Sequence, residues 1–182
     1  MIPKHERIDE FGYEVWEKNV FPLVYLITFR TFGTWLHGDE RTAVKRDGWN
    51  IYGTQRIQPN ERLEKWMLDE MKQDPFVLTG SMRTIVETSV IELCQRRSYG
   101  LGAVNVRTNH VHAVVSAAQK PERISDALKS NATKFLRDAG LIGRETRVWS
   151  RGRSRRYLWK PRHVQAATEY TLYGQGDFVI PD

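Results

Sequence analysis

Two histidines lie one residue apart in the apolar segment "NHVHAVV", as His110 and His112. Alternate residues of a β-strand point to the same face, so a strand here would place both imidazoles together and Val111 on the other side. Neighbouring imidazoles can bind one divalent metal ion and leave coordination positions for water and a substrate phosphate, as an ion that polarises a phosphoryl group requires. Because magnesium prefers oxygen ligands, the histidines alone favour zinc or manganese. Hydrogen-bonded or surface histidines are the alternative interpretation.

Two tyrosines, Tyr170 and Tyr173, lie near the end of the chain in "EYTLYGQGD". A phenol placed beside a metal or a base can attack a phosphodiester and form a phosphotyrosine link, which conserves the bond energy for a later rejoining. Gln175 follows Tyr170 by five residues, and a loosened turn near Gly174 would bring its amide oxygen to the same helix face. The alternative is that these aromatic residues simply pack against a sheet.

The segment from 147 to 162 contains seven basic residues and no acidic one. Cations that alternate with aromatic side chains suit single-stranded nucleic acid, because charges bind the phosphates and rings stack on the bases. We therefore expect nucleic-acid contact here, against the alternative of a surface hairpin whose aromatic residues belong to the core. The residues are Arg147, Arg151, Arg153, Arg155, Arg156, Lys160 and Arg162, with Trp149, Tyr157 and Trp159 between them.

The composition agrees with a basic, single-domain protein. The chain has 182 residues, a formal net charge of +6 and 40% hydrophobic residues, enough for one core. A basic balance favours a polyanionic partner. One cysteine excludes an internal disulfide and agrees with a reducing cytoplasm, where we expect the protein. The longest apolar run, "FPLVYLITF", is too short to span a bilayer, so we expect no membrane partner.

Several elements must position these residues. Hydrophobic periodicity and turn residues predict them in the following order. The predictions are a strand over 23–35, a helix from an N-cap at Ser81 to a stop at Gly100, strands over 103–107 and 110–116 joined by a turn at Thr108 and Asn109, a helix from Pro121 to Gly140, a hairpin or extended arm over the basic segment, and a helix from Pro161 to Gly174 or Gly176. The polar stretch at about 36–80 is predicted to be a flap or insertion within a single domain that spans 1–182.

The order of strand, helix, strand, strand, helix, strand predicts a ferredoxin-like α+β fold with an additional C-terminal helix. Its antiparallel sheet would have both earlier helices on one face and leave the other face for a ligand.

Taken together, these residues resemble the IS200-like transposases, the single-tyrosine (Y1) branch of the HUH endonuclease superfamily, and most of all the REP-associated tyrosine transposases. "VNVRTNHVHAVV" is similar to the segment that carries the family's histidine–hydrophobic–histidine motif. "EYTLYGQG" is similar to the helix with the nucleophilic tyrosine, and "YLITFRTFGTWLHGD" is similar to the first strand of one branch. The resemblance covers about residues 21 to 178.

The resemblance implies a metal-dependent enzyme that cleaves and rejoins single-stranded DNA, with hairpin DNA as its partner. His110 and His112 would bind Mg²⁺ or Mn²⁺, because water and phosphate complete the coordination shell. Tyr170 would be the nucleophile, with Tyr173 as the fallback. The family's third metal contact would fall on Gly174, so Gln175 is the best candidate for it.

The resemblance leaves other functions open. A non-catalytic DNA- or RNA-binding protein could keep the fold, and a replication or relaxase-type nicking domain would usually be longer. Both a homodimer and a monomer occur among such enzymes.

Overall fold

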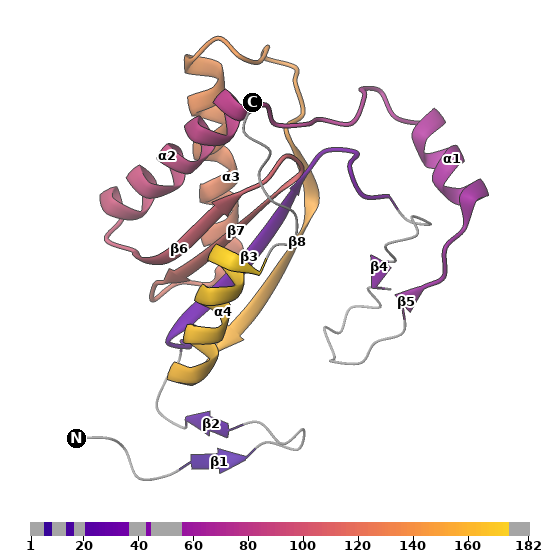
Figure 1. The fold of residues 1–182 in the computed structure, drawn as a ribbon. Coiled ribbons are helices and arrows are strands. Elements are labelled where there is room, and N and C mark those ends of the chain that lie inside the picture. The colour runs from indigo at the N-terminus through magenta and orange to yellow at the C-terminus, as the bar shows by residue number, and fades with distance from the viewer. Residues whose placement is uncertain (1–5, 9–13, 17–20, 37–42, 45–55, 175–182) are drawn as a thin grey trace.

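The computed structural model describes residues 6–8, 14–16, 21–36, 43–44 and 56–174 (Figure 1). Its central feature is a four-stranded antiparallel sheet in the order β6-β7-β3-β8. The strands are β3 (Val24–Thr31), β6 (Gly100–Val106), β7 (His110–Ser116) and β8 (Trp149–Leu158). This order, with a helix between β3 and β6 and another between β7 and β8, is the ferredoxin-like topology, so the predicted fold class is confirmed.

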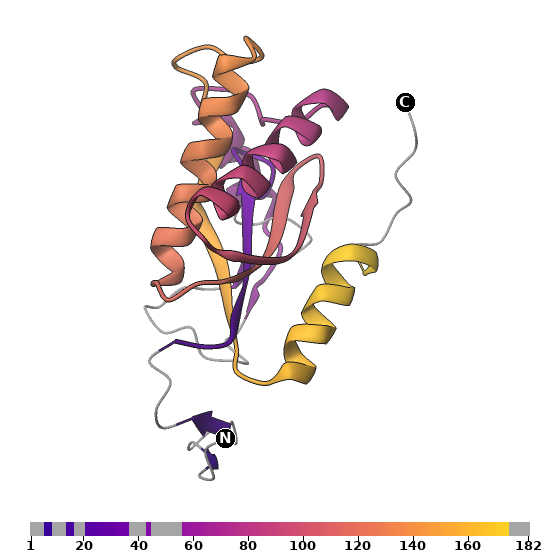
Figure 2. The same cartoon turned by 90° about the vertical axis from the view of Figure 1, so that its left-hand side faces the viewer.

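Helices cover both faces of the sheet. On one face lie α2 (Gly80–Arg96) and α3 (Pro121–Asp138), and on the other lies α4 (Pro161–Tyr173), as Figures 1 and 2 show. The larger core lies beneath α2 and α3, and a smaller one joins α4 to the sheet through Leu26, Ala103, Val114, Leu158 and Ala167. Part of the face expected to take a ligand is therefore occupied by the helix that carries the tyrosines.

Strand alternation separates these two cores. On β7, Val111, Ala113 and Val115 are fully buried in the larger core, whereas Val114 contributes to the smaller one. His110 and His112 share the face of Val114, since residues two apart on a strand point the same way. A slip of one residue in the pairing would exchange the two faces, so the apolar residues fix the side on which the histidines lie.

Both boundaries of the helix predicted from Ser81 to Gly100 are wrong in detail. The N-cap of α2 is Thr79, whose hydroxyl accepts a hydrogen bond from the Met82 amide, and not Ser81. The helix ends at Arg96, the chain turns through Ser98 at a φ of 54°, and Gly100 already opens β6. The reversal that a glycine was expected to provide is made by a serine.

The basic segment is a sheet strand and not a separate arm or hairpin. From Trp149 to Leu158 it pairs with β3 as the edge strand β8, and the register of this pairing shifts between Phe29 and Thr31. The predicted strand over 23–35 is shorter, because β3 ends at Thr31 and the chain turns at Gly33, whose φ is 72°. A side chain at position 33 would also meet Met71 Sδ at 2.9 Å.

The remaining elements are short and lie outside the sheet. They are the pair β1 (Glu6–Ile8) and β2 (Glu14–Trp16), the pair β4 (Ala43–Val44) and β5 (Arg56–Ile57), and α1 (Glu61–Asp69), which buries none of its residues. The last three fall within the predicted insertion. Among the helices of the described ranges, none is both long and apolar enough to cross a bilayer.

Candidate functional site

The two histidines lie at the centre of the sheet, on the strand between β6 and β3. Their ring centroids are 4.8 Å apart and the rings are nearly perpendicular, at 88°. His112 is buried and His110 is partly exposed. Across the strands, His112 pairs with Thr28 on β3 and Asn105 on β6, and His110 pairs with Arg30 on β3.

Hydrogen bonds at Nδ1 orient both imidazoles. His110 Nδ1 lies 2.6 Å from Asn109 Oδ1, and since this oxygen only accepts, the ring nitrogen donates. His112 Nδ1 lies 2.9 Å from the Thr28 hydroxyl, which can accept in the same way. In these tautomers the ring nitrogen with a lone pair is Nε2, the arrangement found where a histidine binds a metal and a neighbouring group fixes its ring. The donor chemistry of the pair therefore fits a divalent ion.

The protein supplies few other strong ligands near this pair. Within the part of the chain that the structure describes, no group of three or more His, Cys, Asp and Glu side chains converges. The predicted third ligand, Gln175, lies outside the described residues. Two imidazoles leave most of the coordination shell to water and to a substrate.

Tyr170 lies beside the histidines. Its ring and that of His112 have centroids 5.7 Å apart and meet edge to face, at 88°. Tyr170 is 48% exposed, whereas Tyr173, three residues later, is 82% exposed at the end of α4. Of the two tyrosines considered from the sequence, Tyr170 is the one whose ring contacts the histidine pair.

Asn105 links the sheet to the helix of Tyr170. Its amide nitrogen donates to the Thr171 carbonyl at 2.8 Å, and Thr171 itself is fully buried. Because Asn105 is also the cross-strand neighbour of His112, the same residue borders the histidine and holds the last turn of α4. The sequence did not identify Asn105; the available signal was a polar residue in the apolar strand "GAVNV".

Gly174 lies against Tyr170. A Cβ placed on it would stand 2.8 Å from Tyr170 Cδ2, closer than such atoms approach in proteins. The amide of Gly174 also donates to the Tyr170 carbonyl at 2.9 Å and ends the helix. The missing side chain at the position where the family resemblance would put a polar ligand thus leaves room for the tyrosine ring.

A second group of residues surrounds the start of β7. The Asn109 carbonyl accepts from the Thr31 amide at 2.9 Å and from the Thr31 hydroxyl at 3.2 Å, so the end of β3 is tied to the residue before His110. In the turn that follows, Trp35 lies beneath the Arg30 guanidinium, with Arg30 Cζ 3.2 Å from the ring centroid. Sequence reasoning missed this arginine because it lies inside a strand and outside the basic segment.

The basic segment is divided between the two faces of the sheet. Arg153 pairs with Asp126 and Arg155 with Glu122, both on α3. The sequence showed no acidic residue within the segment, but the structure brings carboxylates to it from another element. The expectation that all seven cations lack a compensating acid is therefore wrong for these two.

The aromatic residues of the segment also serve the fold. The Trp149 indole donates to the Lys129 carbonyl at 3.0 Å and its ring packs edge-on against Phe29. Tyr157 contacts Tyr25 edge-on, with centroids 5.3 Å apart, and stacks with Trp159 at 6.4 Å. Trp149 and Tyr157 thus follow the alternative interpretation, in which aromatic residues of the segment pack on the core.

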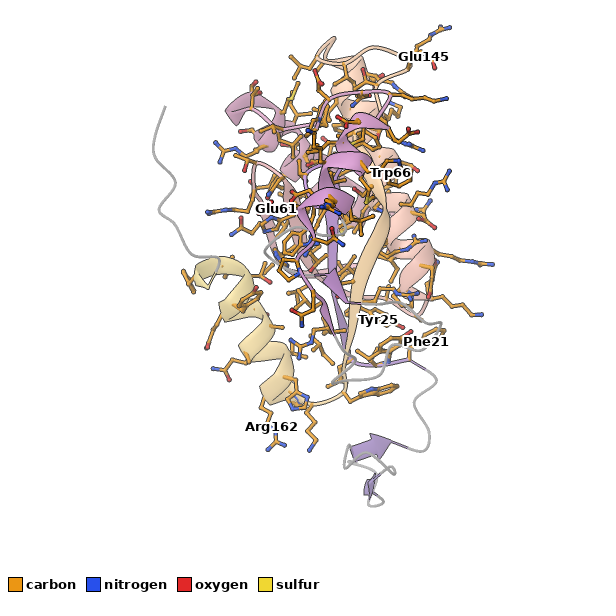
Figure 3. The ribbon with its side chains drawn as sticks, turned by 90° about the vertical axis from the view of Figure 1, so that its right-hand side faces the viewer. Phe21, Tyr25, Glu61, Trp66, Glu145 and Arg162 are labelled. Atoms are coloured by element: carbon orange, nitrogen blue, oxygen red, sulfur yellow. The ribbon has the colours of Figure 1, made fainter. Side chains whose placement is uncertain are left out.

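The other cations lie on different surfaces. Arg156 pairs with Leu26, a residue of the smaller core, and is therefore on the α4 side of the sheet. Lys160 is the N-cap of α4, and Arg162 is exposed at the start of that helix, as Figure 3 shows. Arg147 lies over Phe32 at 5.1 Å and Arg151 is exposed on β8. Arg156, Lys160 and Arg162, which we call the α4-side cations, share the side of the sheet that carries the histidines.

Comparison with known proteins gives structural likenesses alone. No family model matches the chain, and no curated protein matches its sequence. The structure is similar to that of a REP-associated tyrosine transposase bound to a REP hairpin, with 10% sequence identity and a TM-score of 0.48 over 89% of this chain and 72% of that one. It is also similar to a "putative transposase" from Deinococcus radiodurans R1, with 12% identity and a TM-score of 0.47 over 91% of this chain and 100% of that one.

Proposed function

We propose that this chain is a metal-dependent, transposase-like endonuclease that cleaves and rejoins single-stranded DNA through a 5′-phosphotyrosine intermediate, at a site next to a DNA hairpin. The observation that carries the proposal is the contact between the rings of Tyr170 and His112, 5.7 Å apart by centroid. It places a phenol beside two imidazoles whose hydrogen bonds suit metal binding.

His110 and His112 would hold Mg²⁺ or Mn²⁺ through Nε2. The bound ion would neutralise charge on the scissile phosphate. Asn109 and Thr28 keep the rings in the orientation that this binding needs, through their hydrogen bonds to Nδ1.

Tyr170 would attack the phosphorus in line. The bond from its Oη to phosphorus forms while the bond from phosphorus to the 3′ oxygen breaks; the phenol proton is lost and the leaving 3′ oxygen gains one. The strand is left with a free 3′-hydroxyl and a 5′ end linked to Tyr170. Attack by a 3′-hydroxyl on the phosphotyrosine reverses these changes and rejoins the strand, so no external energy source is needed.

The α4-side cations support single-stranded DNA as the substrate. They lie on the histidine side of the sheet, where positive charges can follow a phosphate backbone toward Tyr170. Arg153 and Arg155, which are paired with α3 carboxylates, have a smaller part in this binding.

The test is covalent capture. A pool of labelled DNA hairpins with randomised single-stranded flanks is incubated with the protein and Mn²⁺, and adducts that survive denaturation are isolated and sequenced. We expect an adduct with the wild type and with Tyr173→Phe, the matched control, and no adduct with Tyr170→Phe or without a divalent ion.

Three outcomes would change the proposal. An adduct with Tyr170→Phe that is lost with Tyr173→Phe would move the nucleophile to Tyr173. Binding of the pool without any adduct would instead support the non-catalytic nucleic-acid-binding protein. Nicking without strand transfer, when a second strand with a 3′-hydroxyl is offered, would support the replication-type nicking domain.

A further inference from the structure

Arg30 has a placement that the proposed function does not yet use. It is the cross-strand partner of His110, so its side chain leaves the sheet on the same face and next to that imidazole. The neighbouring pair, Thr28 and His112, confirms the direction of the face, because their side chains are hydrogen-bonded. Arg30 is therefore the cation of β3 that directly borders the histidine pair.

The guanidinium of Arg30 is held against a rigid surface. Its Cζ lies 3.2 Å from the centroid of the Trp35 ring, which is a close stacking contact. Such a contact attracts the cation to the ring and reduces the freedom of a long side chain. Trp35 is itself positioned, because the turn before it is bound to Asn109 through Thr31 and Thr34.

The planar shape of the guanidinium determines what Arg30 can bind while it contacts Trp35. The Trp35 ring lies against the guanidinium carbon, and the N–H groups lie around the edge of the planar guanidinium. Phosphate oxygens are bound along this edge, two at a time. With five N–H donors, the group can bind a phosphate and keep another hydrogen-bond partner.

We propose that Arg30, held against Trp35, binds a nonbridging oxygen of the phosphodiester that Tyr170 attacks. The inference rests on the proposed function for the identity of the reaction. Arg30 brings a positive charge next to the neutral histidine pair, where the proposed divalent ion would add more, so a phosphate between them would be attracted by both. Arg30 then stabilises the charge that develops on the phosphate oxygens, and Trp35 is its positioning residue.

The first experiment measures DNA contact without cleavage. Binding of fluorescent (dT)20 is followed as a function of NaCl concentration, in the absence of a divalent ion. Loss of one phosphate contact lowers the salt slope by about 0.7 for a single strand, and we expect this for Arg30→Gln and not for Arg30→Lys, which keeps the charge. The control is Arg137→Gln, because Arg137 lies on α3, on the other side of the sheet, and donates to the Arg144 carbonyl.

The second experiment measures the rate of adduct formation with a strand recovered by covalent capture. Removal of one donor from a developing oxyanion lowers rates by about 10²- to 10³-fold, and we expect a loss of this size for Arg30→Gln. Arg30→Lys should also be slow, because the planar edge is lost although the charge remains. Trp35→Leu should resemble Arg30→Lys, with the salt slope retained and the rate lowered.

The two experiments separate the possible failures. An unchanged salt slope in Arg30→Gln overturns the DNA contact. A reduced slope with an adduct rate within about threefold of wild type overturns the contact with the scissile phosphate and places Arg30 on the flanking strand. If the wild type forms no adduct, the proposed function fails and the scissile contact fails with it, while the salt slope still decides whether Arg30 binds DNA.

Discussion

Asn105 of β6 and Thr171 of α4 are joined by a hydrogen bond from the Asn105 amide to the Thr171 carbonyl, 2.8 Å long. The bond lies one residue beyond Tyr170 and starts from the strand neighbour of His112. It connects the two halves of the candidate site, the sheet with the proposed metal ligands and the helix with the proposed nucleophile. We therefore regard Asn105 as a residue that positions Tyr170.

Asn105→Ala should slow adduct formation while leaving DNA binding intact. Without the bond the last turn of α4 loses a hydrogen bond to the sheet, and misplacement of a nucleophile by about 1 Å can cost about 100-fold in rate. The unfolding free energy should fall by about 1 kcal/mol. Adduct kinetics and urea denaturation measure the two effects; equal rates in the variant and the wild type would remove Asn105 from this role.

Gly174→Ala should displace the ring of Tyr170, since the new methyl group would lie 2.8 Å from Tyr170 Cδ2. We expect adduct formation to fall by about 10- to 100-fold, for the same reason of misplacement. Gly143→Ala is the matched control, because a Cβ there meets Thr146 Oγ1 at an ordinary 3.7 Å. If both variants react equally fast, the glycine is not needed at position 174.

Asn109→Ala should weaken metal binding even though Asn109 is not proposed as a ligand. The substitution removes the acceptor of the 2.6 Å hydrogen bond from His110 Nδ1. Loss of a hydrogen-bond partner of a metal-binding histidine typically lowers metal affinity by about 10- to 100-fold, and we expect a loss of about this size. Titration calorimetry with Mn²⁺ gives the affinity. His110→Ala and His112→Ala should each abolish binding, and Asn109→Asp, which retains an acceptor, should restore it.

The basic residues should differ in their effect on DNA binding according to the face they occupy. Arg156→Gln should lower the salt slope with (dT)20 by about 0.7, whereas Arg155→Gln should change it much less, because Arg155 is paired with Glu122. The two arginines are adjacent in sequence and have the same charge, so each controls for the other. Equal salt slopes for the two variants would mean that the ion pair with Glu122 does not keep Arg155 from contacting DNA.

Cys94 should make the protein less stable at alkaline pH. Burial raises the pKa of its thiol to about 11, so the folded state holds the proton where the unfolded chain releases it. The unfolding free energy is unaffected well below pH 9 and falls as pH rises from 9 toward 11, by at most about 1.4 kcal/mol per pH unit. Urea denaturation between pH 8 and 10.5 should show a smaller fall for Cys94→Ala than for the wild type.

Much of the fold could be predicted because its signals are local. The alternation around His112, the proline at the start of α3 and the glycine after it each indicate structure within a few residues. The order of those elements along the chain then predicted the ferredoxin-like topology. The capping residue Thr79 was missed because serine and threonine are both good N-cap residues, and Ser81 lies only two residues later. The two are distinguished only by the structure, in which the Thr79 hydroxyl accepts the hydrogen bond.

The candidate site could be predicted only in its motifs. His110, His112 and Tyr170 stand out by type and spacing. Asn105, in contrast, is marked only by its hydrogen bond to Thr171, 66 residues later on α4. Arg30 is marked only by its pairing with His110 on the neighbouring strand β7. Likewise, the pairing of Arg153 with Asp126 depends on the packing of α3 against β8. Contacts between distant segments follow from register, which a charge pattern along the chain does not contain.

The helix that carries Tyr170 is the most shallowly embedded of the three that pack on the sheet. It buries Ala167 and Thr171, whereas α2 buries five residues and α3 eight. Local opening of an element costs less when it buries less apolar surface, so α4 should exchange its amide hydrogens well before α2 and α3 do. In the proposed reaction, a DNA end attached to Tyr170 would then be carried on a helix that can detach and return while the histidine-bearing sheet stays folded.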